Sequence, residues 1–393
     1  MRRVHGWLAL ATGLVLLVIL LSGVALVFQP ELDKLFHPSL YKSTPSSNPI
    51  TPTEAIRAVK EQEPDFPVGD TVVRNRGVYE VYSPNFVRQA HVDPGTGEVL
   101  GVGSHQSGVL GFLGNLHMCG LTCKHYPGYV GFLHDRVRIL GNPLNIGSLC
   151  LCVAALVLVL LCISGLILWW PGIKRMARGF KVRRGGGTYK TNYDLHKVVG
   201  FAAIPFLLFW AITGAGFELK QIEDAWYAVT PGDEPKRDFV PFESKPGSGN
   251  GITPGQAERL ATAAVPGSKS ISITLPADDK KAYYDVWIQH DWDSLATYTW
   301  PGNTEVGVDQ HSGKTKILYG DPDESRPASQ VLWTEWLFAG HSGFLFGPLP
   351  RVVWLLFGLT PLLLAITGTT VWWIRRRKRK RKAPAPVPAP APT

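Results

Sequence analysis

Two histidines stand at the same distance from a pair of small residues. His5 lies 18 residues before Gly23 in a Ser-Gly pair, and His196 lies 18 residues before Gly214 in a Thr-Gly pair. The residues between each histidine and its glycine are almost all apolar, so each histidine lies at the start of an apolar span. An ionisable or metal-ligating side chain at a membrane span is energetically costly and marks a candidate functional site. The matching spacing indicates a duplication that has kept a histidine in each copy.

Four segments of the chain are long and apolar enough to cross a bilayer. Two contain the histidine spacings, and the other two end in Ser164-Gly165 and Thr367-Gly368, each followed by a pair of tryptophans. A helix needs about 20 apolar residues to cross a hydrocarbon core of about 30 Å. The four windows cover residues 7–28, 146–170, 198–217 and 352–374. They predict an integral membrane protein with the lipid bilayer as its first partner.

The basic residues are concentrated in two places. Residues 171–195 hold seven lysines and arginines against one acidic residue, and residues 375–382 are eight consecutive basic residues. The long connections 29–144 and 218–349 hold 10 basic against 11 acidic and 11 basic against 19 acidic residues. The positive-inside rule therefore places both termini and the 171–195 loop in the cytoplasm and both long connections outside. The net charge of +9 reflects this topology, and we expect no nucleic-acid partner.

Each long connection contains the pattern of a small α+β module. The expected elements are a helix over 50–60, strands over 78–82 and 87–92 and a turn over 93–98, then a helix over 252–261, a strand over 283–288 and a turn over 308–314. Thr51 or Thr53 is expected to cap the first helix. Alternating apolar residues predict the strands, and Pro, Gly and Asp predict the turns. Two transmembrane pairs with one module each complete the duplication.

The module sequences carry a family resemblance. The stretches ITPTEAIRAVK, VYEVYS and VDPGTGEVLG look like a PepSY domain, and ITPGQAERLA with VDQHSGKTKIL looks like a second one. Together with the four spans and the Leu-His motifs, the chain up to Arg381 resembles the PepSY-associated transmembrane family of iron-regulated membrane proteins. That family includes an inner-membrane ferric-siderophore reductase that binds two b-type haems. The resemblance implies a multi-pass protein of the cytoplasmic (inner) membrane.

The resemblance gives the edge histidines a role as axial ligands of two haems. His5 and His196 are expected to face each other on the cytoplasmic side, one imidazole on each face of a haem iron. On the outer side, His341 precedes the fourth span and needs a partner before the second span. His117 and His134 both follow a leucine and both remain candidates, with a small preference for His117 from its distance to the preceding PepSY-like turn.

The other histidines and the cysteines have simpler interpretations. The histidines expected at the surface, because they lie in hydrophilic stretches or turns, are His37, His91, His105, His290 and His311. Cys119 and Cys123 lie in an outside connection, where a local disulfide is plausible. The three cysteines of the second span are expected to pack inside the membrane.

The expected activity is an oxidoreductase that reduces ferric-siderophore outside the cytoplasm, since reduction lowers the affinity of iron for hard oxygen donors. No side chain is expected to be catalytic in itself. The chain has no G-x-G-x-x-G motif and no cytoplasmic domain for a flavin or nicotinamide, so the electron donor is expected to be a quinol, a small reductant or a separate cytoplasmic reductase. The alternative hypotheses are a haem-free, membrane-anchored PepSY protein that binds or regulates a partner, and a transporter.

The predicted fold class is an α-helical membrane protein, a four-transmembrane-helix bundle from a duplicated two-helix unit with two small α+β PepSY-like extracytoplasmic modules. The predicted segments are transmembrane helices over 1–28, 145–170, 196–217 and 350–374, extracytoplasmic modules over 29–144 and 218–349, a basic cytoplasmic loop over 171–195, and a basic and then Pro/Ala-rich cytoplasmic tail over 375–393.

Overall fold

The structure, a computed structural model, describes the chain except for residues 140, 184, 233–241, 246, 248–250, 291–301, 346 and 382–393. The Pro/Ala-rich end of the predicted tail therefore lies outside the described residues. The chain divides into two compact units. The first holds residues 1–24, 148–219 and those from 353 onward, and the second holds residues 25–147 and 220–352.

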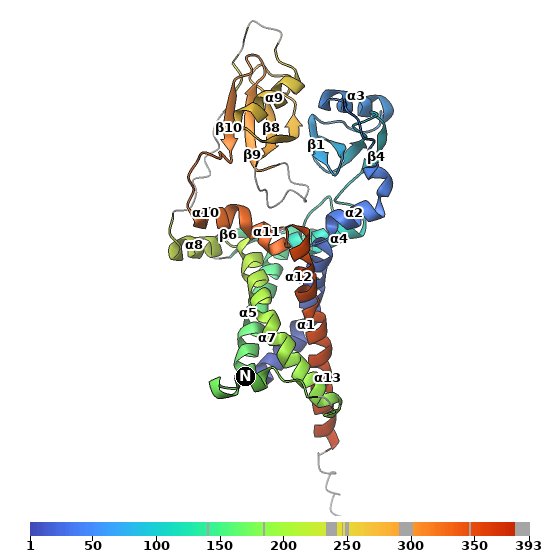
Figure 1. Ribbon diagram of the computed structural model, residues 1–393. Coiled ribbons are helices and arrows are strands. Elements are labelled where there is room, and N and C mark those ends of the chain that lie inside the picture. The colour runs from blue at the N-terminus through green and yellow to red at the C-terminus, as the bar shows by residue number, and fades with distance from the viewer. Residues whose placement is uncertain are drawn as a thin grey trace, which may run out of the picture. The chain divides into compact units, whose positions relative to one another are not determined.

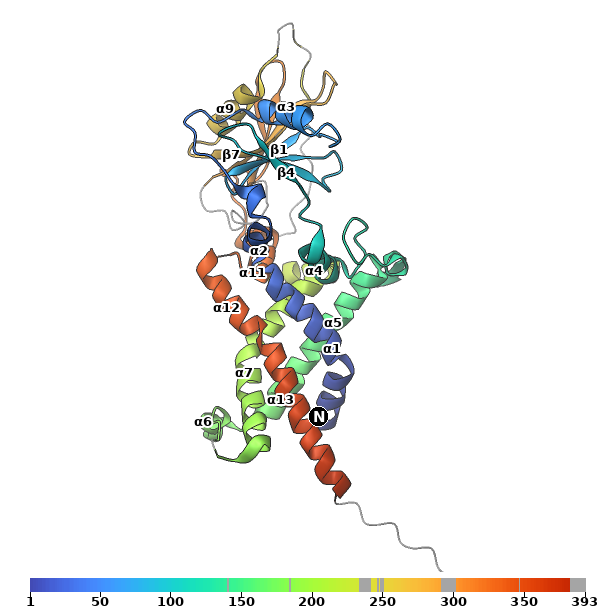
Figure 2. The same cartoon turned by 90° about the vertical axis from the view of Figure 1, so that its right-hand side faces the viewer.

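Long apolar helices form the first unit (Figures 1 and 2). These helices are α1 (Arg2–Leu26), α5 (Ile146–Trp169), α7 (Gly187–Gly216), and α12 (Pro348–Gly358) followed by α13 (Thr360–Arg381). Large apolar side chains on them remain exposed, among them Leu14 (75%), Leu156 (60%) and Ile366 (52%). Helices with apolar side chains on every face, and with backbone groups bonded within the helix, fit the interior of a bilayer. The described residues thus contain four candidate spans, as expected of a multi-pass membrane protein.

The fourth span is divided where α12 ends and α13 begins. Pro361 has no N–H, so the carbonyl of Phe357 loses its usual helical hydrogen bond. The hydroxyl of Thr360 donates to that carbonyl instead, at 2.6 Å. The freed carbonyl is thereby satisfied within the span, as the bilayer requires.

Helix α7 starts nine residues before the predicted boundary at residue 196. The extra turns are tied to the preceding loop, where Arg183 donates to both carboxylate oxygens of Asp194 at 2.7 and 2.8 Å. The rest of the basic loop contains the short helices η3 (Ile173–Arg175) and α6 (Met176–Gly179). His196 therefore lies inside a helix, with its direction fixed by the backbone on both sides.

Small side chains allow α7 to pack closely on its neighbours. Ala203 and Ala211 are 0% and 3% exposed, and they share a core with Leu16 of α1 and Leu158 of α5. Small residues at such contacts let helices approach closely inside a membrane.

An eight-stranded antiparallel sheet organises the described part of the second unit (Figures 1 and 2). Its strands are β1 (Thr71–Asn75), β2 (Val78–Tyr82), β3 (Gln89–Val92), β4 (Val99–Gly103), β7 (Lys269–Thr274), β8 (Tyr283–Gln289), β9 (Thr304–Asp309) and β10 (Thr315–Tyr319). They run in the order β10-β9-β8-β7-β1-β2-β3-β4. Strands β1 and β7 join the two halves, with Val72 opposite Ile273. The two connections thus share one sheet, whereas the sequence predicts two separate modules.

Each half of the sheet carries one helix, and both helices begin in the same way. In α3 (Pro52–Gln62) the hydroxyl of Thr51 accepts from the backbone N–H of Glu54, whose carboxylate accepts from the N–H of Thr51. In α9 (Pro254–Ala264) Thr253 and Gln256 form the same capping box. Such a box satisfies two backbone donors that the first turn leaves unpaired. The structure confirms Thr51 as the cap and confirms both predicted helices, which begin at Pro52 and Pro254 rather than at residues 50 and 252.

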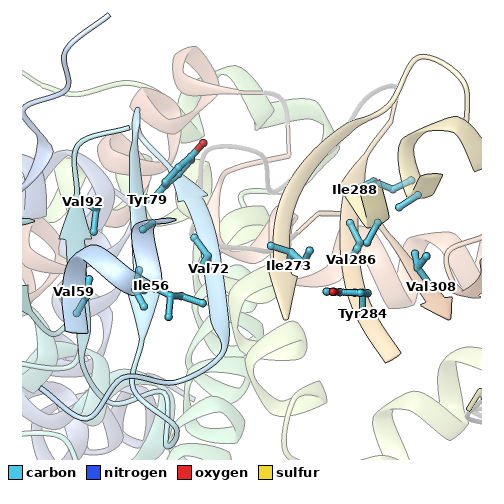
Figure 3. Packing of buried hydrophobic residues seen from close by; sticks show 14 of the residues in the cluster. Ile56, Val59, Val72, Tyr79, Val92, Ile273, Tyr284, Val286, Ile288 and Val308 are labelled. Carbon is cyan, nitrogen blue, oxygen red and sulfur yellow. The ribbon is translucent and has the colours of Figure 1, made fainter. Parts of the chain in front are cut away.

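The core lies between these helices and one face of the sheet (Figure 3). Val59, Val72, Ile273, Val286 and Val308 are fully buried there. The apolar alternation of β2 and β8 supplies this face, since successive side chains of a strand point to opposite sides. The predicted strands over 78–82 and 283–288 are confirmed.

The rest of the second unit consists of shorter elements. They are α2 (Gln29–Phe36), η1 (Pro38–Tyr41), α4 (Gly108–Cys119), η2 (Gly131–His134), the hairpin of β5 (Arg136–Ile139) and β6 (Asn142–Asn145), α8 (Lys220–Val229), α10 (Ala328–Val331), the π-helix η4 (Leu332–Trp336) and α11 (Leu337–Ser342). A disulfide joins Cys119 to Cys123.

Candidate functional site

His5 and His196 each hydrogen-bond to a hydroxyl on another span. Nδ1 of His5 on α1 lies 2.8 Å from Oγ of Ser164 on α5, and Nδ1 of His196 on α7 lies 3.0 Å from Oγ1 of Thr367 on α13. His5 near the start of α1 meets Ser164 near the end of α5, so these two helices are antiparallel, whereas Thr367 lies in the first half of α13. Both histidines predicted for the cytoplasmic side are thus hydrogen-bonded to a neighbouring span.

The two hydroxyls decide which ring nitrogen carries the proton. Oγ1 of Thr367 donates to the carbonyl of Leu363 at 2.7 Å, and Oγ of Ser164 donates to the carbonyl of Leu161 at 3.2 Å. A hydroxyl has one hydrogen to donate, and here the carbonyl accepts it. In its contact with the imidazole each hydroxyl must therefore be the acceptor, and Nδ1 of each ring is the donor. The hydrogen-bond network thus assigns both neutral rings a proton on Nδ1 and a lone pair on Nε2.

Glycines next to these hydroxyls leave room for the rings. A Cβ on Gly368 would lie 3.1 Å from Cε1 of His196, closer than an ordinary carbon contact of about 3.5–4.0 Å. A Cβ on Gly165 would lie at an ordinary 3.6 Å from Cε1 of His5. The Ser-Gly pair near the end of α5 and the Thr-Gly pair in the first half of α13 therefore act in the same way. In each pair the hydroxyl holds a ring and the glycine leaves space for it. The repetition of these pairs is the signal in the sequence, but the hydroxyl contacts could not be predicted from it.

His117 and His341 form a second pair, in the other unit. His117 lies on the last turn of α4 and His341 on α11, with ring centroids 6.1 Å apart and ring planes at 48°. Burial, together with the nearness of His117, lowers the pKa of His341 to about 3. His341 is therefore neutral near pH 7, which is the form that binds metal ions.

Glycine-terminated helices position both outer histidines. Gly120 ends α4 in the left-handed region at φ 57°, and a Cβ there would lie 2.5 Å from the backbone of Gly147. Only glycine meets both requirements at this position. Helix α11 likewise ends at Gly343, with φ 81°, and it follows the π-helical turn η4. Such widened turns occur frequently at functional sites.

His134, the other candidate for the outer site, has different partners. Its Nδ1 lies 3.1 Å from the carbonyl oxygen of Thr122, and its ring packs against Tyr129 with centroids 6.0 Å apart. Of the two histidines that the sequence left open, the structure brings His117 to His341.

The outer pair fits a haem iron. A metal–imidazole bond of about 2 Å puts two nitrogens on opposite faces of one metal about 4 Å apart, and their ring centroids about 6 Å apart. The observed separation is 6.1 Å. The inner pair offers the same donor chemistry, two imidazoles whose Nε2 lone pairs are not used by the hydroxyl bonds. The outer pair is thus spaced to hold a haem iron, and the inner pair supplies the same type of ligand atom.

Two of the histidines predicted at the surface are covered by other parts of the chain. His91 is buried, at 1% exposed, and His105 is half-buried, with 16% of its side chain exposed. The connector between the first span and the sheet covers them. Its η1 segment packs on β3 and β4, and the ring centroid of Tyr41 lies 5.3 Å from that of His91. His37 remains 51% exposed. The Ser/Pro-rich composition of the connector gave no indication that it covers the sheet.

The described fold is that of a multi-pass membrane protein with an attached α+β unit and paired imidazoles. The family model described as "PepSY-associated TM region" matches residues 2–375. The chain belongs to this family of PepSY-associated transmembrane proteins. A comparison with curated proteins finds no match.

Proposed function

We propose that this protein transfers electrons across the cytoplasmic (inner) membrane, holds two b-type haems, and reduces ferric-siderophore from Fe3+ to Fe2+ on the extracytoplasmic side. The observation that carries the proposal is the 6.1 Å separation between the ring centroids of His117 and His341. Two half-buried imidazoles at that separation could hold one iron between them. When bound, each haem supplies a one-electron Fe3+/Fe2+ couple.

The proposed axial ligands are His5 with His196 for the cytoplasmic-side haem and His117 with His341 for the extracytoplasmic-side haem. Ser164 and Thr367 hold the inner rings in the tautomer whose Nε2 is unprotonated. An outer hydrogen bond of this kind also fixes ring orientation and raises ligand basicity. The histidines have no need to touch the substrate, since their role is to bind the iron and, with burial, to set its potential.

Iron release follows from the chemistry of the substrate. One electron converts bound Fe3+ to Fe2+, which hard oxygen donors bind more weakly. The electron donor in this proposal is a quinol, a small reductant or a separate cytoplasmic reductase. Both termini lie in the cytoplasm, as the excess of basic residues in 171–195 and 375–382 supports.

We also propose that the chain arose by duplication of a two-helix unit with one PepSY module in each copy. The matching capping boxes of α3 and α9 support this. In addition, the hydroxyl of Tyr79 donates to the carbonyl of Ile50 at 3.0 Å, and that of Tyr284 donates to the carbonyl of Ile252 at 2.9 Å. The histidine–hydroxyl bonds of the spans repeat in the same way.

The test is an anaerobic reaction of the chemically reduced protein with a ferric hydroxamate siderophore. We expect the reduced haem absorption bands to disappear as Fe2+ appears in a ferrous-specific chelator, with one Fe2+ for each electron lost. The gallium complex of the same siderophore is the control, because it has a similar shape to the ferric complex and its Ga3+ is not reduced under these conditions. A protein that stays reduced and yields no Fe2+ would refute the reductase activity.

A further inference from the structure

A cluster of metal-ligand side chains lies in the first half of the sheet, away from the histidine pairs described above. Glu80 on β2 stands directly opposite His91 on β3 in the antiparallel register, and His105 follows β4. Residues directly opposite each other place their side chains on the same face. Tyr79 and Val92, their neighbours along the strands, face the core in Figure 3, so the cluster lies on the other face, where η1 packs.

The donor atoms of the cluster lie close together. Oε1 of Glu80 is 3.2 Å from Nε2 of His105 and 3.5 Å from Nε2 of His91. One ligand atom from each of the three residues lies within 4.8 Å of the other two. Donors bound to one tetrahedral ion at about 2.0–2.1 Å are about 3.3 Å apart. The distances from Oε1 of Glu80 to the two Nε2 atoms are close to this value, so small side-chain movements would bring the three donors onto one ion.

His105 has the outer partner that a metal-binding histidine needs. Its Nδ1 lies 3.1 Å from Oδ2 of Asp33, which leaves Nε2 directed to Glu80. Asp33 is held in turn by the hydroxyl of Tyr41 and by Nη1 of Arg76 at 3.2 Å. Histidine ligands of metals commonly donate their second ring nitrogen to a carboxylate in this way.

His91 is the observation that most needs an explanation. It is 1% exposed, and within the described part of the chain neither of its ring nitrogens has a hydrogen-bond partner. Its contact with Glu80, at 3.5 Å, is too long to count as a good hydrogen bond. A buried polar group without a partner is energetically costly. A cation coordinated by Nε2 would give one of the two ring nitrogens a partner.

We propose that Glu80, His91 and His105 bind a divalent first-row transition-metal ion such as Zn2+ or Fe2+, with Asp33 orienting His105. Two imidazoles and one carboxylate are a donor set for these ions, whereas Mg2+ and Ca2+ prefer oxygen ligands alone. Three protein ligands leave a fourth position for water or a small ligand. The site does not depend on the proposed haem function.

The second half of the sheet shows that the fold itself does not require the cluster. The pair corresponding to Glu80 and His91 there is Asp285 opposite Gly307, on β8 and β9. Both halves keep the same strand order around the junction of β1 and β7. If these positions served only to hold the strands together, Asp285 with Gly307 would serve as well as Glu80 with His91. The rival explanation is that His105 carries a proton and serves as a counter-ion to Asp33 and Glu80.

The experiment is a calorimetric titration of the chelator-treated, detergent-purified full chain with ZnCl2, and with MgCl2 as the control ion. We expect one Zn2+ per chain with a dissociation constant below about 1 μM, and no comparable uptake of Mg2+. His91→Gln and His105→Gln each remove a donor at little change of volume, and we expect each to weaken zinc binding at least tenfold. Asp33→Asn keeps all three donors and should weaken binding by about 10- to 100-fold.

The matched control is His125→Ala, since His125 is exposed and lies outside the cluster. It should bind zinc as the unaltered protein does. The proposal is overturned if the unaltered chain binds no more Zn2+ than the His91→Gln and His105→Gln variants, or if His125→Ala weakens binding as much as they do. Should those variants not fold, Co2+ added to the unaltered chain decides the question. Visible bands of tetrahedral Co2+ support the site, and the spectrum of hydrated Co2+ alone refutes it.

Discussion

The imidazole of His196 donates to the hydroxyl of Thr367, with 3.0 Å between Nδ1 and Oγ1. That hydroxyl in turn donates a hydrogen bond to the carbonyl of Leu363, one turn earlier in the same helix. His5 and Ser164 repeat the arrangement on the other helix pair. Both rings are therefore held with Nε2 unprotonated, the form needed for an axial ligand.

Replacing Thr367 with valine keeps its shape and removes the hydroxyl. The His196 ring then loses the acceptor that fixes its tautomer and orientation. We expect Thr367→Val to weaken haem binding by about 10- to 100-fold and to shift the midpoint potential of one haem. Haem titration and a redox titration measure the two effects. Thr369→Val is the matched control, because that hydroxyl is exposed and bonds to carbonyls of its own helix. Equal effects from both variants would show that the hydroxyl of Thr367 has no special role.

Adding a methyl group at residue 368 should displace the His196 ring. The new Cβ would lie 3.1 Å from Cε1 of that ring, so the imidazole or the helix must move. We expect Gly368→Ala to lower the content of the inner haem, with a broadened low-spin spectrum. Gly165→Ala should have a smaller effect, since its Cβ would meet Cε1 of His5 at 3.6 Å. The reverse order of effects would contradict this account of the two glycines.

The outer pair predicts which histidine holds the second haem. His117→Ala should reduce the haem content from two to one per chain, because His341 then has no partner ring at 6.1 Å. His134→Ala should keep both haems, since His134 lies in the short helix η2 and its Nδ1 bonds to the backbone carbonyl of Thr122. A pyridine haemochrome assay on each variant gives the count. Loss of a haem in His134→Ala alone would reverse the assignment.

Burial and the charge of Glu305 raise the pKa of Asp285 to about 7. The folded state therefore holds a proton that the unfolded state has released, and its stability falls as pH rises from about 4 to about 7. Asp285→Asn removes this dependence. We expect it to raise the free energy of unfolding by about 1–3 kcal/mol at pH 8 and to have little effect below pH 4.

Thermal unfolding at several pH values tests the role of Asp285. Asp278→Asn provides the control, because Asp278 is exposed. If the Asp285→Asn variant is less stable than the unaltered protein at pH 8, Asp285 is ionised and well satisfied in the folded state.

Several elements could be predicted because they depend on local sequence. The apolar windows define the spans, and the Thr-Pro pairs at 51–52 and 253–254 mark the starts of α3 and α9. The strands over 78–82 and 283–288 were predictable from their β-branched and aromatic residues. The pairing of β1 with β7 was not predictable, because it joins strands that are far apart in the sequence. The residues of a strand do not show which distant strand it pairs with.

The candidate site was predictable in its residues and not in its contacts. Spacing singled out His5, His196 and His341, and left His117 and His134 open. Only the tertiary structure places one of the two, His117, beside His341. The burial of His91 was missed for the same reason, since it depends on a connector that folds back over the sheet.

The most direct test of the central claim is a haem count on the unaltered protein. The full chain, expressed with ample haem and purified in detergent, is examined by absorption before and after reduction with dithionite, and by a pyridine haemochrome assay. The account predicts sharp low-spin b-type bands and two haems per chain. A colourless protein under these conditions would contradict it, and would leave a haem-free, membrane-anchored binding protein as the better explanation.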